Sequence, residues 1–195
     1  MYIILSFHLL ACSDATSLLD GKEYLSWVKN PDNGLMLTKK LGGISYSAQY
    51  KPYDFIVLNE QKEYNLPKTI VENREKELKG MIYYNIRIST LDQTDILAKG
   101  VNDKSIYTQR LNYLSYDFQN NISLVTETDS VNCGLYHFVQ TYGITPYIDM
   151  VVGFAAEQIA TSQTLVIDDR VFGNGIIKFY IDKQDINNIP HLVTI

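Results

Sequence analysis

The sequence has few of the residues from which common catalytic and metal sites are built. It contains two cysteines, three histidines and one tryptophan in 195 residues. The two cysteines do not stand at the short spacing of a zinc site, and no Gly-x-Ser-x-Gly turn marks a hydrolase nucleophile. These absences argue against a zinc protein and against an α/β-hydrolase, and we expect no cofactor.

An excess of positive charge is also missing. Seventeen basic residues face twenty-two acidic ones, so the net charge is −5 and there is no basic stripe that would hold a phosphate backbone. This excludes nucleic acid as the expected partner. Hydrophobic residues make up 46% and charged residues 20%, an ordinary balance for a folded chain.

The first twelve residues have a distinct character. Residues 2–10 are apolar except for Ser6 and His8, and Ala11 and Cys12 follow them directly. This run is far shorter than the roughly 20 apolar residues that cross a bilayer as a helix, but it suits the apolar region of a secretion signal. After Cys12 the chain turns polar at once, beginning with Ser13 and Asp14.

The motif Leu9-Leu10-Ala11-Cys12 resembles the lipobox of bacterial lipoproteins. The resemblance implies that the peptide before Cys12 is removed and that Cys12, carrying acyl chains such as palmitate, becomes the first residue of the mature protein. It predicts a signal peptide over 1–11, a lipidated tether over 12–20 and one globular domain over 21–195. No Lys or Arg precedes the apolar run, which for a signal peptide would place the true start upstream of Met1. The alternative is an N-terminal strand with Cys12 as a small buried hydrophobe.

The whole chain is similar to uncharacterised lipoproteins of Bacteroidota-type bacteria. The similarity lies in residues 27–35, 49–55 and 168–173. By the sorting pattern of bacterial lipoproteins, Ser13 after the cysteine implies the outer membrane, and the lack of an acidic cluster there implies its periplasmic face. The implied partners are the membrane, through the lipid anchor, and other envelope proteins.

Alternation of apolar and polar residues predicts an α+β, β-rich fold, a mostly antiparallel sheet or sandwich with two or three packed helices. Residues 35–50 read as a hairpin with Gly42-Gly43 at its turn. The clearest strand is 81–90 and the clearest helix is 105–120. Shorter helices are expected at 21–30, 53–60 and 65–79, and Asp20 is the expected N-cap of the first. Further strands are expected at 122–127, 132–141, 148–155, 164–168, 175–181 and 191–195.

Tyrosine is abundant, with fifteen residues, and several stand close together in sequence. One interpretation is an exposed aromatic platform for a glycan or another ligand. The other is that tyrosine is a favoured, half-buried strand residue, and it is the preferred one for any single position. The clusters are Tyr46, Tyr50 and Tyr53; Tyr83 and Tyr84; Tyr113 and Tyr116; and Tyr142 and Tyr147.

Few polar residues suggest chemistry. Cys133 and His137 would share one face of a strand about 13 Å apart, too far for a catalytic pair. Asp168 and Asp169 could hold a metal, but with Arg170 beside them a salt-bridged loop is the preferred interpretation. A hydrolase would have to use His137 or His191, because no other histidine follows Cys12.

The sequence therefore predicts a non-enzymatic envelope lipoprotein, a tethered module that binds other envelope proteins or has a structural role. A glycan-binding or small-ligand-binding module that uses exposed tyrosines is the alternative. A hydrolase is the least favoured of the three hypotheses.

Overall fold

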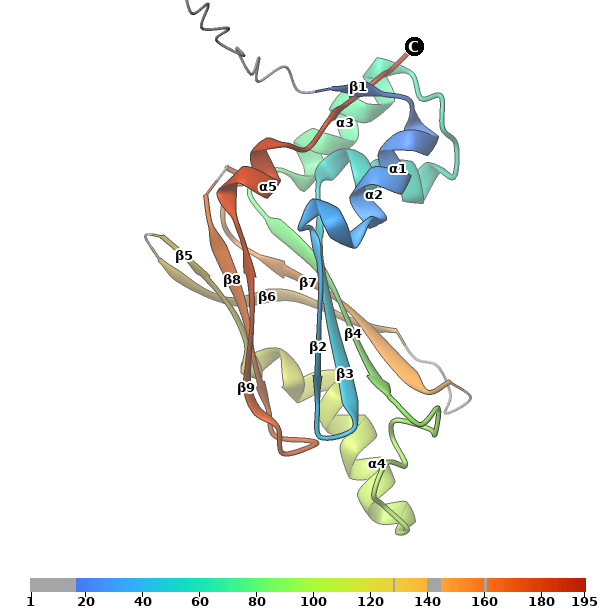
Figure 1. Ribbon diagram of the computed structural model, residues 1–195, viewed down its shortest axis with the longest axis vertical. Helices are drawn as coiled ribbons and strands as arrows, with labels where there is room; N and C mark the ends of the chain where they lie inside the picture. The colour runs from blue at the N-terminus through green and yellow to red at the C-terminus, as the bar shows by residue number, and fades with distance from the viewer. Residues whose placement is uncertain (1–16, 128, 140–144, 160) are drawn as a thin grey trace, which may run out of the picture.

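The structure, a computed structural model, describes residues 17–127, 129–139, 145–159 and 161–195 (Figure 1). The predicted signal peptide, Cys12 and Tyr142 lie outside these residues.

The described chain is α+β and is built around one antiparallel sheet of eight strands, which confirms the predicted fold class. The sheet curls until it is nearly closed into a barrel, and its strand order is β2-β3-β4-β7-β6-β5-β8-β9. The strands are β2 (Met36–Leu41), β3 (Ile44–Lys51), β4 (Ile82–Thr90), β5 (Ile122–Thr126), β6 (Ser130–Val139), β7 (Tyr147–Phe154), β8 (Gln163–Asp169) and β9 (Gly175–Ile181).

Alternate residues of each strand fill the interior, because successive side chains of a strand point to opposite faces. The inward side chains of β3 and β4 are almost all apolar or tyrosine and are buried. Tyr84 packs edge-on against Tyr50 and Phe154, with ring centroids 5.6 and 6.2 Å apart. The abundance of tyrosine is therefore in large part a property of the core.

Helices gather at the two ends of the sheet. The described residues contain five α-helices, where two or three were expected. Helices α1, α2, α3 and α5 lie at one end, and α4 lies at the other (Figure 1). Asp20 caps the first helix as predicted, accepting hydrogen bonds of 2.9 Å from the amides of Lys22 and Glu23. The helices are α1 (Gly21–Lys29), α2 (Tyr53–Gln61), α3 (Lys68–Leu78), α4 (Lys104–Asn112) and α5 (Lys183–Asn187).

The helix predicted over 105–120 is not regular to its end. After α4 the chain widens into a π-helical turn at Tyr113–Asp117 and then tightens into a 3-10 turn at Phe118–Asn121. Leu114 and Phe118 both remain fully buried through these changes. The irregular turns thus keep the apolar face in the core while the chain bends into β5.

The two ends of the described domain meet. Leu18–Leu19 forms β1 and pairs in parallel with β10 (His191–Leu192), at the end of the sheet that α1 to α3 occupy. The strand predicted over 191–195 is therefore short, and β1 falls within the predicted tether. Beyond β10 the main chain continues as a partner of the loop before α3, with Ile195 N donating to Leu66 O at 3.0 Å.

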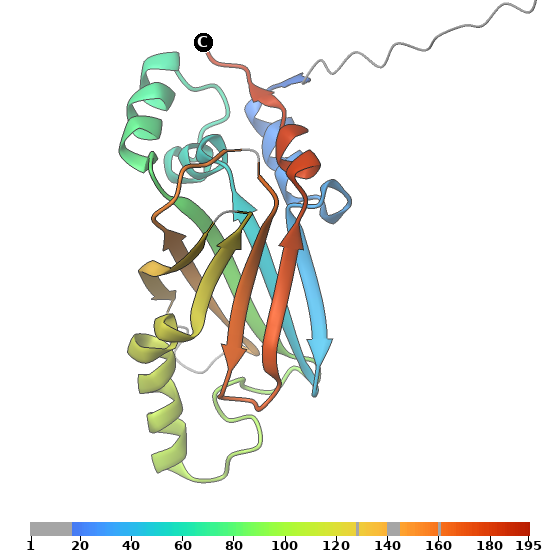
Figure 2. The same cartoon turned by 90° about the vertical axis from the view of Figure 1, so that its left-hand side faces the viewer.

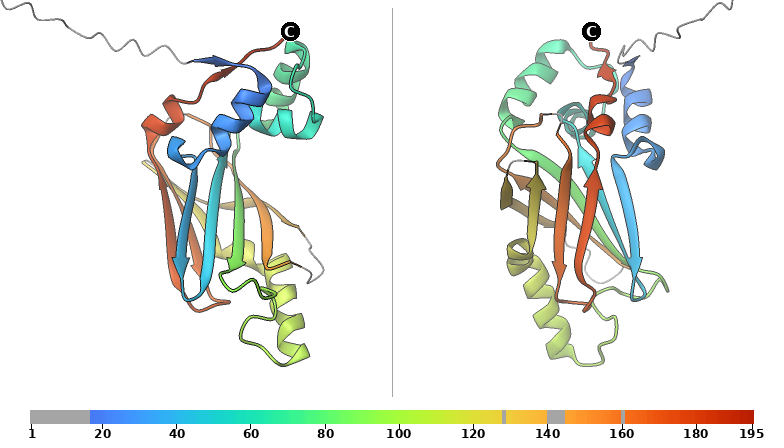
Figure 3. Two further views of the ribbon diagram at one scale, coloured as in Figure 1. Left: turned by 45° about the vertical axis from the view of Figure 1, so that its right-hand side comes forward. Right: turned by 60° about the vertical axis from the view of Figure 1, so that its left-hand side comes forward.

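The seam of the sheet lies between β2 and β9, the first and last strands of the order, which are not hydrogen-bonded to each other. Figure 3 shows these two strands on either side of it. Contacts join the hairpin ends: the hydroxyl of Tyr46 on β3 donates to Asp169 Oδ2 at 2.6 Å, and Asn174 Nδ2 donates to the same hydroxyl at 2.8 Å.

Candidate functional site

The strongest candidate surface is on the outer side of β9. Ile177, Phe179 and Ile181 point inward and are buried, so the residues between them point outward. Of these, Ile176 is 66% exposed and Tyr180 56% exposed, with Lys178 between them. Register places Tyr180 beside Thr164 and Lys178 beside Val166 on β8, and Thr164 beside Val125 on β5.

We call this surface, formed by Ile176, Lys178, Tyr180, Val166 and Val125, the β9 face. None of the described helices crosses it (Figure 2). The Tyr180 hydroxyl lies 3.1 Å from both Ser162 Oγ and Asp182 Oδ2, which fixes the direction of the ring. The face therefore offers apolar side chains, one cation and an oriented aromatic ring to an incoming molecule.

A second candidate is a groove of about 430 Å³ between the turn after α4 and β6, which we call the Tyr116 groove. Its most prominent side chain is Tyr116, which is 71% exposed. Aromatic rings with hydroxyl and amide groups among them suit a sugar or another small neutral ligand. The lining residues are Ser115, Tyr116, Gln119, Tyr136, His137 and Phe138.

The most densely hydrogen-bonded polar group is the carboxylate of Asp169, at the hairpin end of the seam. It is only 2% exposed and accepts from the Tyr46 hydroxyl and from the amides of Val171, Phe172 and Asn174. Burial, with the Asp169 hydrogen bond, raises the pKa of Tyr46. Because every partner is internal, we assign this network to the fold, where it joins two hairpins.

The carboxyl groups of Asp54 on α2 and Glu75 on α3 form a pair at the opposite end of the sheet. Burial, together with the neighbouring Glu75 on α3, raises the pKa of Asp54 on α2 to about 7. A groove of about 490 Å³ adjoins Glu75 and is also lined by Glu72, Glu157 and Tyr53. Within the described ranges, no group of three or more His, Cys, Asp or Glu side chains is placed to hold a metal ion.

The structure corrects one prediction about Cys133 and His137. A β-bulge at Gly134 shifts the register of β6, so Cys133 pairs with Phe154 on the inner face and His137 pairs with Val151 on the outer face. The two side chains therefore lie on opposite faces, where the unbroken alternation of a regular strand predicts the same face. Burial raises the pKa of Cys133 to about 11, which disfavours its thiolate.

The other predicted polar residues are placed largely as expected. Arg170 Nε lies 2.7 Å from Asp168 Oδ2, so the salt-bridged loop is confirmed, and Asp169 points the other way into the core. His137 lies on the eight-stranded sheet and His191 on the two-stranded one, so the structure does not bring the two histidines together on one sheet.

Four of the eight clustered tyrosines that the structure describes are buried, so they cannot form an exposed platform. Tyr46, Tyr50, Tyr83 and Tyr84 are buried. Tyr84 points inward to Gln163 Oε1 at 2.9 Å, whereas Tyr83 points to the other face of β4 and reaches Leu78 O. Among the clustered tyrosines that the structure describes, Tyr116 is the most exposed.

Sequence reasoning identified the strand that became β9 but not its exposed face. Within 175–181 one side of the alternation is wholly apolar and the other carries Ile176, Lys178 and Tyr180. The pattern therefore indicates which side enters the core, but it does not show that the other side is left uncovered. None of the helices in the described part of the chain has the length and hydropathy that a membrane crossing requires.

Comparison of the chain with protein-family models, with curated proteins and with solved structures finds no significant match in any of the three. The function proposed below therefore rests on the residues and geometry of this chain.

Proposed function

We propose that the protein is a non-enzymatic lipoprotein of the bacterial outer membrane that binds another envelope protein through the β9 face. The observation that carries the binding role is the exposure of Ile176 and Tyr180 on a sheet surface that none of the described helices covers. Clustered apolar side chains on a protein surface mark interaction sites, and tyrosine is enriched in such interfaces. The anchoring role rests on the lipobox-like motif that ends at Cys12.

Anchoring is tested by separating membranes from the aqueous fraction of the native host. We expect the wild-type protein in the membrane fraction and the Cys12→Ala variant in the aqueous fraction, because acyl chains supply the membrane affinity. Cys133→Ala is the matched control and should stay with the membrane. A Cys12→Ala variant that remains membrane-bound would contradict the anchor.

Binding through the β9 face is tested by chemical cross-linking in the native envelope followed by purification of the tagged protein. We expect one cross-linked protein with the wild type, and at least about tenfold less of it with the double variant Ile176→Ser and Tyr180→Ser. Ile106→Ser is the control, because Ile106 is an exposed apolar residue on α4. Equal recovery from all three proteins would rule out the β9 face.

The Tyr116 groove favours a second candidate function, the binding of a glycan or another small neutral ligand. Its aromatic rings would stack on a sugar, and Ser115 and Gln119 would hydrogen-bond its hydroxyl groups. Oligosaccharides prepared from the host envelope should bind to the wild type and to Tyr64→Ala, but not to Tyr116→Ala. Binding that survives Tyr116→Ala, or binding absent from the wild type, would exclude the groove.

A further inference from the structure

Among the described residues, no strand is hydrogen-bonded to the outer edge of β9, which faces β2 across the seam. In the order of the eight-stranded sheet β9 stands last, paired only with β8. A strand at the edge of a sheet presents main-chain N–H and C=O groups that an extended chain can pair with. Such strand addition is a recurring way in which proteins recognise peptides.

The exposed side chains of the β9 face lie on this same strand. A strand added beside β9 would place its own outward side chains about 5 Å from those of Ile176, Lys178 and Tyr180. Apolar residues opposite Ile176 and Tyr180 would remove both from water. The free edge and the exposed apolar side chains are separate observations, and an added strand accounts for both.

The charged side chains near the seam indicate which charge a strand that pairs with β9 should carry. Lys178 lies on β9, and Lys39 and Lys40 lie on β2 across the seam. In the part of the chain that the structure describes, no acidic side chain forms an ion pair with any of the three. Lysines on an edge discourage pairing with a second copy of that edge, because like charges would meet, and they favour an acidic strand.

Of the two edges, β9 fits an added strand better than β2. The outward residues of β2 include Thr38 and Lys40, which are polar and leave no large apolar surface for a partner to cover. On β9, the outward residues are Ile176 and Tyr180, with the single lysine Lys178 between them.

We propose that the edge of β9 binds an extended segment of the partner protein by β-strand addition. In this segment two apolar residues flank an acidic residue at alternate positions, so that the carboxylate lies opposite Lys178 and the apolar side chains cover Ile176 and Tyr180. The inference rests on the proposed function, since it names the class of partner that the β9 face binds.

The probe for this proposal is the synthetic peptide Thr-Val-Thr-Glu-Thr-Val-Thr, labelled with a fluorophore and titrated with the detergent-solubilised full chain. We expect binding that weakens at least about tenfold with Lys178→Glu, because the attraction between residue 178 and the glutamate of the peptide becomes repulsion. Replacing the glutamate of the peptide by lysine should restore binding to that variant. Lys22→Glu, the same change on α1, is the control and should bind like the wild type.

Two further measurements separate strand pairing from simple adhesion. A peptide N-methylated at the alternate amides that would face β9 lacks every donor to that strand and should not bind. Hydrogen exchange should show new amide protection at Gly175–Ile181 when the unmodified peptide binds. No binding at millimolar peptide, equal binding of the methylated peptide, equal binding to Lys178→Glu, or protection elsewhere than β9 would each overturn strand addition.

These results are distinguishable from a failure of the proposed function. If the cross-linked partner is lost with the Ile176→Ser and Tyr180→Ser variant but β9 gains no protection from the peptide, the face binds a partner by another geometry. If no partner depends on the face, the proposed function fails whatever the peptide does.

Discussion

At the scale of the residue, the side chain with the most demanding surroundings is Asp169. Its carboxylate is buried and accepts four hydrogen bonds, one from the Tyr46 hydroxyl and three from main-chain amides. Donors that lose a buried acceptor are left unpaired, and an unpaired buried polar group costs about 1–3 kcal/mol. The neighbouring Asp168 is half-buried and pairs with Arg170 near the surface.

We therefore predict that Asp169→Ala lowers the free energy of unfolding by about 3 kcal/mol, and Tyr46→Phe by about 1 kcal/mol. Asp168→Ala, the adjacent control, should change it by less than about 1 kcal/mol, since it loses a surface ion pair with Arg170 and one long hydrogen bond from Asn121 Nδ2. Urea unfolding followed by circular dichroism measures all three. Equal losses for the two aspartates would show that the buried network adds nothing.

The carboxyl pair predicts a pH dependence. The pKa of Asp54 is raised from 3.8 to about 7, so the folded protein retains a proton that the unfolded chain releases at lower pH. Over that window the native state binds more protons, and the free energy of unfolding therefore falls as pH rises.

Asp54→Asn should flatten this slope and stabilise the protein at pH 8 by about 1–2 kcal/mol, because no charge then has to be buried. Unfolding measured at several values between pH 5 and 8 tests it. Asp32→Asn, on an exposed turn, serves as the control. A slope that Asp54→Asn leaves unchanged would show that another group titrates.

At the scale of the element, the hairpin turn between β2 and β3 is constrained by the turn between β8 and β9, which lies across the seam. Gly42 and Gly43 have φ angles of 55° and 80°, a left-handed pair typical of a two-residue hairpin. A Cβ at Gly42 would collide with the Asn174 side chain, whereas a Cβ at Gly43 would meet open space.

We predict that Gly42→Ala is more destabilising than Gly43→Ala, by about 1 kcal/mol, since both carry the left-handed strain but only the first carries the collision. In an Asn174→Ala background the difference should disappear. Thermal unfolding of the variants measures this. Equal effects in the native background would mean that the two turns do not touch in solution.

Prediction from sequence succeeded where a local pattern determines an element. The alternation in 81–90 and the Gly42-Gly43 turn predicted β4 and the β2–β3 hairpin, and Asp20 predicted the start of α1. It failed where contacts between residues far apart in the sequence determine the structure. The bulge at Gly134 depends on how β6 meets β7, the π turn on burial of Leu114 and Phe118, and β1 on a partner at the other end of the chain.

The same distinction holds for the candidate sites. The exposure of Ile176 and Tyr180 follows from the lack of a described helix over the outer face of β9, which no local pattern encodes. The Asp54–Glu75 pair joins two helices, and the Tyr46–Asp169 hydrogen bond joins residues 123 positions apart. Neither has a signature within a short stretch of sequence.

At the scale of the whole molecule, the two strands that border the seam are held by fewer main-chain hydrogen bonds than the strands elsewhere in the sheet. β4 and β7 are hydrogen-bonded on both sides, whereas β2 and β9 are each bonded on one side only. We expect main-chain amides of β2 and β9 to exchange with solvent at least about tenfold faster than those of β4 and β7. Hydrogen exchange of the unliganded protein measures this. Uniform protection would mean that hydrogen bonds close the seam in solution.

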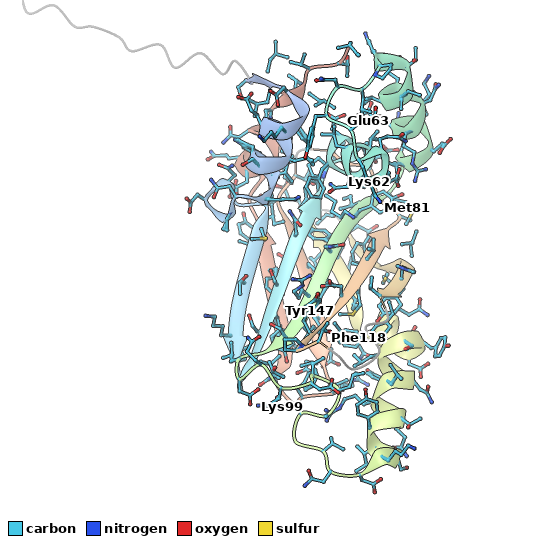
Figure 4. The ribbon with its side chains drawn as sticks, turned by 90° about the vertical axis from the view of Figure 1, so that its right-hand side faces the viewer. Lys62, Glu63, Met81, Lys99, Phe118 and Tyr147 are labelled. Carbon is cyan, nitrogen blue, oxygen red and sulfur yellow. The ribbon has the colours of Figure 1, made fainter. Side chains whose placement is uncertain are left out.

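If Cys12 is lipidated as proposed, the pairing of β1 with β10 limits how the domain can lie on a membrane. Only five residues separate Cys12 from Leu18, and an extended chain of that length reaches about 20 Å at most. A lipid at Cys12 would hold the pole of α1 to α3 against the bilayer and direct the pole of α4 away from it (Figure 4). The strands run between these poles, so a partner segment paired with β9 would extend away from the membrane surface and would not lie flat along it.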